Sequence, residues 1–530
     1  MSTRLGTSDR QLPGTADRRT WLGLAVLTLP VFLVSMDVSV LYLAIPSITD
    51  ALAPSAAQQL WILDIYGFLI AGLLITMGNL GDRIGRRRIL LAGAAVFGGA
   101  SILAAFAPTA GILIAARALM GVGGATLMPS SLSLIANMFS DDRERGRAIG
   151  VWTAAFAGGA AVGPVIGGVL LHHFWWGSAF LINVPVLAAL LILGPRLIPE
   201  YKAPSTARFD VLGVVLSMAG ILPVVYAIKT LASDGADAGV IVIGLAGLAL
   251  LAGFVVQQRQ SAAPLLDLKL FRNAHYVGAI SVALVGMMAL GGMSYLTGVY
   301  LQSVMGHDVL AAAVAGLPMA IAVAVFSIGA SRIATMVGTR AAFLGSIVLA
   351  AAGNFGLLAL TTSSPIWVYL VFTFIAGIGY GIQFSLVSVV VVGAVPPERS
   401  GSASGISETS FELGNALGLA LFGSLATLVF RGHRDGWSFG DTLGETLHRA
   451  LEMGVQGDGL AAAARQSYVD GMHAASLAIG ISMTVLGIGV FFAMRKPLQP
   501  WTADAVTADA RTDTDDSEAP APLPSTECMN

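Results

Sequence analysis

Residues 78–88 read Gly78-Asn79-Leu80-Gly81-Asp82-Arg83-Ile84-Gly85-Arg86-Arg87-Arg88, and they separate two apolar runs at roughly 58–80 and 89–107. Each run is long enough to cross a bilayer as a helix, which takes about 20 apolar residues. The glycines permit a tight turn, and the arginines are typical of a loop on the cytoplasmic side of a membrane. The stretch therefore predicts two antiparallel membrane helices joined by a short cytoplasmic loop.

Apolar runs of this kind recur along the whole chain. Of its 530 residues, 55% are hydrophobic and 11% are charged, whereas a soluble protein is about 25% charged. This composition excludes a soluble enzyme and a disordered protein, and a net charge of −2 offers no basic excess for binding nucleic acid. We expect an all-α membrane protein with 14 transmembrane helices, at roughly 21–45, 58–80, 89–107, 111–137, 148–171, 177–195, 209–229, 238–256, 275–303, 309–330, 341–360, 366–394, 403–430 and 472–494.

The basic residues set the orientation. When the N-terminus is placed in the cytoplasm and the spans alternate, most Lys and Arg residues fall in cytoplasmic segments, and the short outer loops hold only Lys229. The positive-inside rule therefore predicts that both termini are cytoplasmic.

Three segments are expected outside the membrane. Residues 1–19 are predicted to form a cytoplasmic arm and 495–530 a disordered acidic tail. Residues 431–471 are predicted to form a long extracytoplasmic loop, in which Leu443, Leu447 and Leu451 indicate one amphipathic helix. That helix either caps the outer mouth of the protein or belongs to a solvated spacer.

No catalytic or metal-binding pattern stands out. None of the lysines follows a glycine, so a Walker A phosphate loop is absent, and no histidine precedes a glutamate, so there is no zinc helix of the His-Glu-x-x-His type. The single cysteine, Cys528, excludes intramolecular disulfides and cysteine-based metal sites. We therefore expect no enzyme activity, cofactor or metal.

Charged residues inside the apolar runs are the candidate functional groups. Each costs roughly 2.5–3.5 kcal/mol at the bilayer centre, so its presence needs a reason. The alternative to a functional role is a buried ion pair that braces helices, and this alternative is strongest for the one base. These residues are Asp37, Asp64, Arg117, Glu408 and Glu412.

Glu408 and Glu412 are four residues apart and so share one helix face. Two carboxylates this close in an apolar setting resist double ionisation, which predicts that the pair holds a proton. A carboxylate that exchanges a proton for a cation is the minimum requirement for proton/cation antiport.

Aromatic side chains near these acids are candidates for holding a flat cation by cation–π contact. For each of them, a lipid-facing or packing role is the alternative, and Trp61 and Tyr66 also suit an interfacial belt. The candidates are Tyr42, Trp61, Tyr66, Trp152, Tyr380, Phe384 and Phe411.

The run at 148–171 is rich in small residues. They predict close approach of a neighbouring helix, with a bend at the proline. The residues concerned are Gly150, Gly159, Gly163, Pro164, Gly167 and Gly168.

Taken in order, these motifs resemble those of the major facilitator superfamily, and in particular its fourteen-helix drug:proton antiporters, the quaternary-ammonium-compound exporters. The similarity covers nearly the whole chain. It rests on the loop Gly78 to Arg88, on Arg117 to Gly121, on the glycine–proline pattern of 150–168, on Met36 to Pro46, and on Ser407 to Gly414.

The resemblance implies two six-helix bundles, at 20–195 and 275–494, with two extra helices at 209–256, which rock to give alternating access. It also implies a bacterial cytoplasmic membrane, a monomer, and cationic small molecules and protons as partners. By the same resemblance, the four acids bind substrate or proton, Arg117 couples protons or gates, and the loop residues form a gate. Those loop residues are Gly78, Gly81, Asp82, Arg83, Gly85 and Arg86.

The chain departs from the family pattern at Tyr42, where asparagine is usual, and in the loop from Gly329 to Arg340, which lacks a central acid. We therefore expect a proton-coupled exporter of lipophilic cations, such as dyes and quaternary ammonium biocides. The alternative is a dedicated exporter of a natural-product antibiotic, peptide or lipid on the same fold.

Overall fold

The structure is a computed structural model, and it describes residues 16–54, 56–202, 210–233, 237–261, 268–395, 400–432, 439–440 and 443–495. Most of the predicted arm and tail therefore lies outside the described residues.

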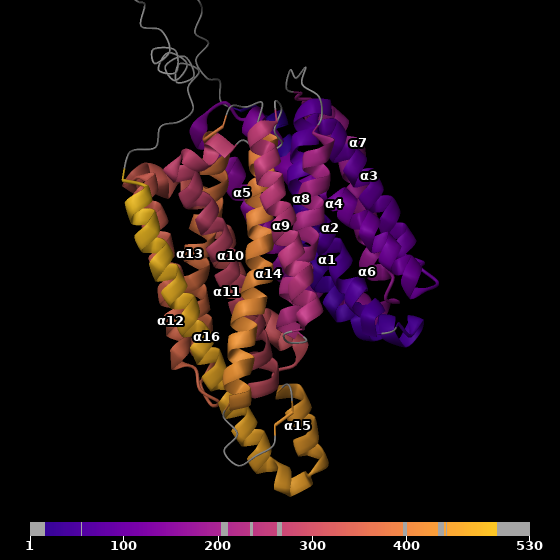
Figure 1. Cartoon of the computed structure of the whole chain (residues 1–530), viewed down its shortest axis with the longest axis vertical. Coiled ribbons are helices and arrows are strands. Elements are labelled where there is room, and N and C mark those ends of the chain that lie inside the picture. The colour runs from indigo at the N-terminus through magenta and orange to yellow at the C-terminus, as the bar shows by residue number, and fades with distance from the viewer. Residues whose placement is uncertain are drawn as a thin grey trace, which may run out of the picture.

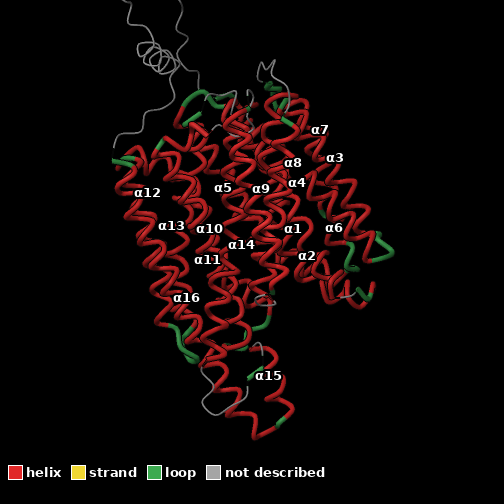
Figure 2. Tube along the Cα trace, in the orientation of Figure 1, coloured by secondary structure: helices red, strands yellow, loops and turns green. Residues whose placement is uncertain are grey.

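Helices make up the regular structure of the described residues, and no strand occurs among them (Figure 2). In the part of the chain that the structure describes, fourteen helical segments are long and apolar enough to cross a membrane, which confirms the all-α membrane fold. The helices of the first half are α1 (Arg18–Leu52), α2 (Ala56–Ile84), α3 (Arg86–Ala105), α4 (Ala110–Met138), α5 (Asp142–His173), α6 (Ser178–Leu181), α7 (Asn183–Leu197), α8 (Val211–Ser233) and α9 (Ala238–Gln260). Those that follow are α10 (Ala274–Val299), α11 (Val309–Val337), α12 (Thr339–Gly356), α13 (Ile366–Gly393), α14 (Ser400–Gly432), α15 (Leu443–Glu452) and α16 (Gly457–Ala493).

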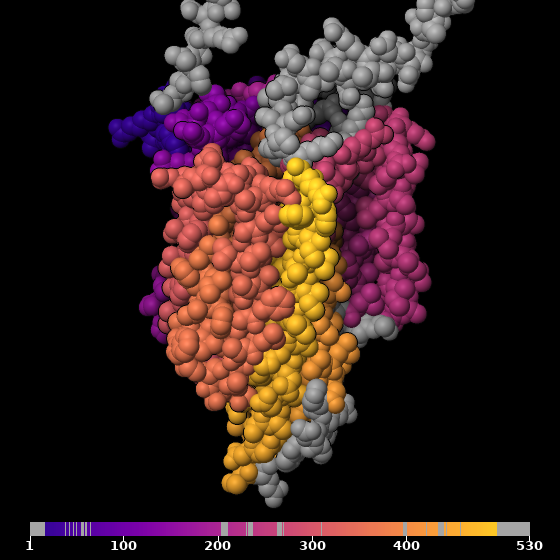
Figure 3. All heavy atoms as spheres, turned by 90° about the vertical axis from the view of Figure 1, so that its left-hand side faces the viewer, coloured from indigo at the N-terminus to yellow at the C-terminus, as the bar shows by residue number. Residues whose placement is uncertain are grey.

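The buried apolar side chains form two clusters. One lies almost wholly within residues 24–198 and the other almost wholly within 254–494. Helices α1–α7 accordingly pack among themselves, and so do α10–α16. Helix α9 packs on α8, and α8 in turn lies against α2 and α14 (Figure 1). Figure 3 shows α16 exposed along the height of the second group, beside α12.

Helix α16 begins earlier than its apolar run predicts, at Gly457 instead of 472. Four alanines at 461–464 explain this extension, because alanine is the strongest helix former. The predicted amphipathic helix is present as α15 and packs on α16, where the two project beyond the other helices (Figure 1). Leu443 and Leu447 pack inward, but Leu451 is 81% exposed.

The two helix groups touch closely near one end of the molecule. Gly78 of α2 lies on the backbone of Gly401 in α14, and Gly150 of α5 lies on the backbone of Ser327 in α11. A Cβ atom on either glycine would overlap the facing backbone, so glycine is required at both contacts. We call this end, which includes the turn between α2 and α3, the Gly85 end, and the opposite end the α15 end.

Candidate functional site

Asp37 and Arg117 form an ion pair between α1 and α4, buried to 4% and 1% exposure. The amide of Asn183 donates to Asp37 Oδ1 at 3.4 Å, and Arg117 Nε donates to the carbonyl of Ile62 at 3.3 Å. Since each charge has the other as counter-ion and a neutral partner besides, the pair is compatible with burial in an apolar bundle.

Tyr66 of α2 connects this pair to the second helix group. The Arg117 guanidinium lies 4.4 Å from the centroid of the Tyr66 ring. The Tyr66 hydroxyl is in electrostatic range of Asp37, Arg117 and Glu412, yet it has no hydrogen-bond partner among the described residues. A buried hydroxyl without a partner is a group that a ligand or water would satisfy.

Glu408 of α14 is 3% exposed and interacts electrostatically with Glu412 one turn later. Among the described residues, Glu408 has no ion pair, and its Oε1 has no hydrogen-bond partner. Glu412 is half-buried. Unlike Asp37, Glu408 therefore lacks a described counter-ion, and it would rest most easily in the protonated form.

Three of the candidate aromatics form a column beside these acids. The rings of Tyr380 and Phe384 stack at 5.7 Å, and Phe384 meets Phe411 edge-on at 5.3 Å. Phe411 lies between Glu408 and Glu412 in the sequence, so the column reaches the acidic turn of α14. Its rings give an apolar surface next to a carboxylate, as a lipophilic cation requires.

The other candidates are placed differently. Trp61 is 42% exposed and meets Phe68 edge-on, as a lipid-facing residue would. Trp152 is buried, and its Nε1 donates to Ser131 Oγ at 2.9 Å, which is a packing role. The side chains of Asp64 and Tyr42 lie outside the described part of the structure.

The glycines of α5 position α1 and with it Asp37. Gly159 lies against Phe32 and Ser35, and Gly163, next to Pro164, lies against Met36 and Ser39. Gly167 continues the contact one turn further, at Val40, whereas Gly168 has no neighbour within 4 Å of a Cβ position. These glycines therefore allow α1 to pack closely on α5 on both sides of Asp37.

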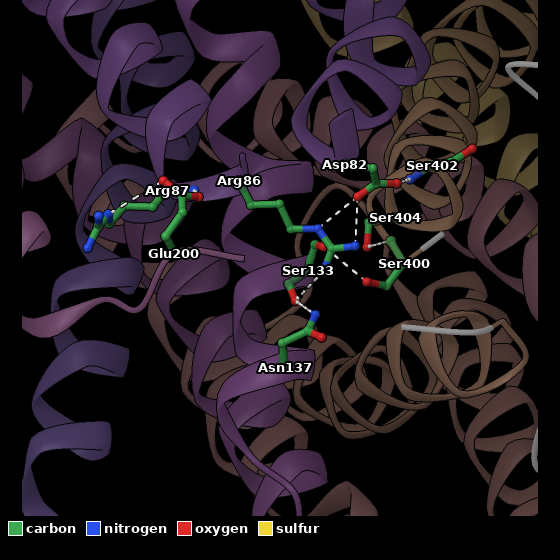
Figure 4. A network of polar contacts seen from close by, with 9 residues as sticks. All are labelled: Asp82, Arg86, Arg87, Ser133, Asn137, Glu200, Ser400, Ser402 and Ser404. Carbon is green, nitrogen blue, oxygen red and sulfur yellow. Dashed lines mark hydrogen bonds and ion pairs between the residues drawn. The ribbon is translucent and has the colours of Figure 1, made fainter. Parts of the chain in front are cut away.

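Asp82 and Arg86 form a second buried ion pair, at the Gly85 end (Figure 4). Both the Nε and the Nη2 atoms of Arg86 lie 2.7 Å from Asp82 Oδ1. Asp82 Oδ2 accepts the backbone N–H of Ser402 at 3.1 Å, in the first turn of α14. Asp82 thus contacts the N-terminus of α14, and this contact joins the two helix groups.

Neighbouring residues extend this network. Ser133 of α4 and Ser400 of α14 share a hydrogen bond of 3.0 Å (Figure 4). Gly81 packs against Ile89, and Arg83 Nε donates to Asn79 Oδ1 at 3.0 Å. Gly85 has φ +117°, and a Cβ there would meet the Glu200 carboxylate, so the turn requires glycine.

Several neutral polar residues of the site were not singled out from the sequence. Asn183 touches Asp37, and both polar atoms of the buried Gln383 side chain lack partners among the described residues. The sequence clue to both residues was an amide side chain within an otherwise apolar run. Burying an amide costs free energy, as burying a charge does, but less of it. No group of three His, Cys, Asp or Glu side chains in the described part is arranged to hold a metal.

Comparison with known proteins agrees with this architecture. The family model of the Major Facilitator Superfamily matches residues 27–419. The multidrug efflux pump LfrA of Mycolicibacterium smegmatis is 40% identical over 417 residues, which cover 79% of this chain and 83% of LfrA. The methyl viologen resistance protein SmvA of Salmonella typhimurium is 32% identical over 491 residues, which cover 90% and 99% of the two chains.

A solved structure shares the fold. The human organic anion transporter MFSD10 aligns with a TM-score of 0.58 at 14% identity, covering 89% of this chain and 99% of that one. Fourteen apolar helices, two helix groups and these relatives lead to one conclusion: the chain belongs to the Major Facilitator Superfamily and is a multi-pass membrane transporter, related to multidrug efflux pumps.

Proposed function

We propose that this protein exports lipophilic cations, such as dyes and quaternary ammonium biocides, in exchange for protons. The observation that carries the proposal is Glu408, a buried carboxyl without an ion pair among the described residues, placed next to an aromatic column. The name of the relative SmvA supports the substrate class, because methyl viologen is an aromatic cation with two quaternary nitrogens.

Glu408 is the proposed exchange site. When it is deprotonated, its charge attracts a cation onto the faces of Phe384 and Phe411. When it is protonated, the attraction is removed and the cation leaves. One proton exchanged for one monovalent cation moves no net charge, so the pH gradient drives this exchange. Each further proton that moves inward adds about 2.3 kcal/mol per 100 mV of membrane potential.

Asp37 and Arg117 form the proposed second element of coupling. A cation near Tyr66 competes with Arg117 for Asp37, so that binding in one helix group changes the charge balance at the other. Asp64 is proposed as a further acid of this region, by resemblance to the exporters alone.

Alternating access would proceed by rocking of the two helix groups about this central region. The contacts at the Gly85 end, Asp82 with Ser402 and Ser327 with Gly150, must then break for a cation to enter there. We place the Gly85 end in the cytoplasm of a bacterium because its loops carry most of the basic residues. We further propose that one chain suffices for transport.

The test is ethidium transport into proteoliposomes under an imposed pH gradient. Wild-type protein should give saturable transport that an uncoupler abolishes, and Glu408→Gln should abolish the dependence on the gradient. The matched control is Glu452→Gln, which alters an exposed carboxyl of α15 and should transport like wild type. Gradient-driven movement of a neutral or anionic compound, with none of ethidium, would contradict the proposal and favour a dedicated natural-product exporter.

A further inference from the structure

A cavity of about 740 Å³ lies between the start of α5 and the end of α11, at the Gly85 end. Its basic residues are Arg143 and Arg147 of the first helix group and Arg332 of the second. Ser331, Ile328 and Met336 complete much of the remaining lining. The cavity has the size of a small-molecule site, and it borders the contact where Gly146 of α5 meets Ser331 of α11.

Among the residues that the structure describes, the lining holds no carboxylate to neutralise these three arginines. The acids at the start of α5 are engaged elsewhere. Asp141 caps the helix, Asp142 pairs with Arg145, and Glu144 accepts the backbone N–H of Ala16. Arg147 also lies 5.8 Å from the ring centroid of Trp21, which fixes its direction. Arginines from two helices that line one cavity, with no counter-ion among the described residues, fit a phosphate, because guanidinium groups bind phosphate by paired N–H donors.

The apolar surroundings indicate where the phosphate comes from. Ile321, Val325 and Ile328 lie four and three residues apart on α11, and so on one face, with exposures of 57%, 57% and 38%. Ile328 belongs both to this face and to the cavity lining. A lipid whose phosphate lies in the cavity would therefore place its acyl chain along this face of α11.

We propose that this cavity binds the head group of an anionic phospholipid and thereby stabilises the packing of α5 on α11. Without the lipid, arginines of the two helix groups repel one another across the contact. With it, one phosphate bridges Arg143 and Arg332. The inference depends neither on the cationic substrate nor on proton coupling, so it stands or falls separately from the proposed function.

The test compares thermal unfolding of the full chain in dodecyl maltoside micelles with and without added phosphatidylglycerol. Wild type should unfold at a higher temperature with phosphatidylglycerol, and the double variant R143Q/R332Q should lose most of this rise. The matched control is R259Q/R272Q, which removes the same charge at exposed sites and should keep the rise. An equal loss in both variants would overturn the proposal, because it would indicate general charge attraction.

Two further experiments distinguish the lipid from free phosphate and avoid dependence on the folding of the double variant. Inorganic phosphate should not reproduce the effect, and a full rise with phosphate alone would overturn the lipid as the ligand. Native mass spectrometry of wild type and Arg332→Lys gives a readout that does not depend on the double variant folding. Phosphatidylglycerol should bind to the Arg332→Lys variant at least about tenfold more weakly than to wild type, because lysine keeps the charge but loses the paired donors. Equal retention would contradict the site.

Discussion

Asp37 and Glu408 are both buried acids, but their surroundings differ at the level of single atoms. Asp37 has Arg117 as counter-ion and Asn183 as donor. Glu408, in contrast, has an oxygen without a hydrogen-bond partner among the described residues, and a second acid one turn away. Asp37 is therefore held within an ion pair, while Glu408 has no described counter-ion and is suited to exchange a proton. We assign charge balance to the first acid and exchange to the second.

The pair Asp37–Arg117 yields a prediction through a double-mutant cycle. Asp37→Asn and Arg117→Met each strand one buried group, and each should lower the free energy of unfolding by about 3–5 kcal/mol. The double variant should regain much of that loss, because no unpaired charge remains, but it should not export cations. Thermal unfolding in detergent and ethidium efflux measure the two effects. Wild-type efflux by the double variant would show that the pair only braces α1 against α4.

At this scale the sequence revealed which residues are unusual but not how they pair. A charge in an apolar run is visible because its cost is local. The contact between Asp37 and Arg117 joins positions 80 residues apart, which no spacing rule predicts. Asn183 and Gln383 were missed because a neutral amide in an apolar run is a weaker signal than a charge.

Helix α5 packs against other helices through two faces. Its first turns pack through Gly146 and Gly150 on α11 in the other helix group, and its second half packs through Gly159 and Gly163 on α1. In the proposed alternating access, the first contact opens while the second moves as a unit. One helix thus links the position of Asp37 to the state of the Gly85 end.

Gly150→Val tests the first face. The added side chain would meet the backbone of Ser327, so it should shift the population towards a state that is open at the Gly85 end. Spin labels at exposed positions Arg88 and Met336, in a Cys528→Ser background, should then show an added longer distance. Gly168→Val is the control, since a Cβ there meets nothing within 4 Å. An unchanged distance distribution in Gly150→Val would contradict the assignment of this contact to the gate.

The helices themselves were predictable because transfer of an apolar run into the membrane is a local property of the sequence. The start of α16 was not, since alanines and polar residues extend that helix beyond its apolar run. The sequence also could not show which helix packs on each group of glycines, because small residues indicate close packing but not the identity of the neighbouring helix.

On the scale of the whole molecule, the network of Asp82 holds two helix groups together at one end. The ion pair with Arg86, the bond to Ser402 and the bond between Ser133 and Ser400 all lie there (Figure 4). The sequence predicted a turn here, and by resemblance a gate that includes Asp82. It could not show that α14 is the helix that Asp82 contacts, because that contact spans 320 residues.

Asp82→Asn should weaken this closure, because the amide loses the charge that Arg86 and the Ser402 N–H both stabilise. A cysteine at Ser404, which is fully buried, should then react faster with a water-soluble maleimide in the Cys528→Ser background. Asp142→Asn is the control, since that carboxyl is 82% exposed and pairs only with Arg145 among the described residues. Equal labelling rates in Asp82→Asn and its control would argue against a gate at Asp82.

Proton/cation exchange requires that a bound cation displaces a proton from Glu408. This displacement can be measured without a membrane. Ethidium is added to purified protein in weakly buffered detergent solution containing a pH indicator. We predict that wild type and Glu452→Gln release protons as they bind ethidium, and that Glu408→Gln binds it without this release. Binding by wild type with no proton release at any starting pH would contradict the exchange of a proton for a cation.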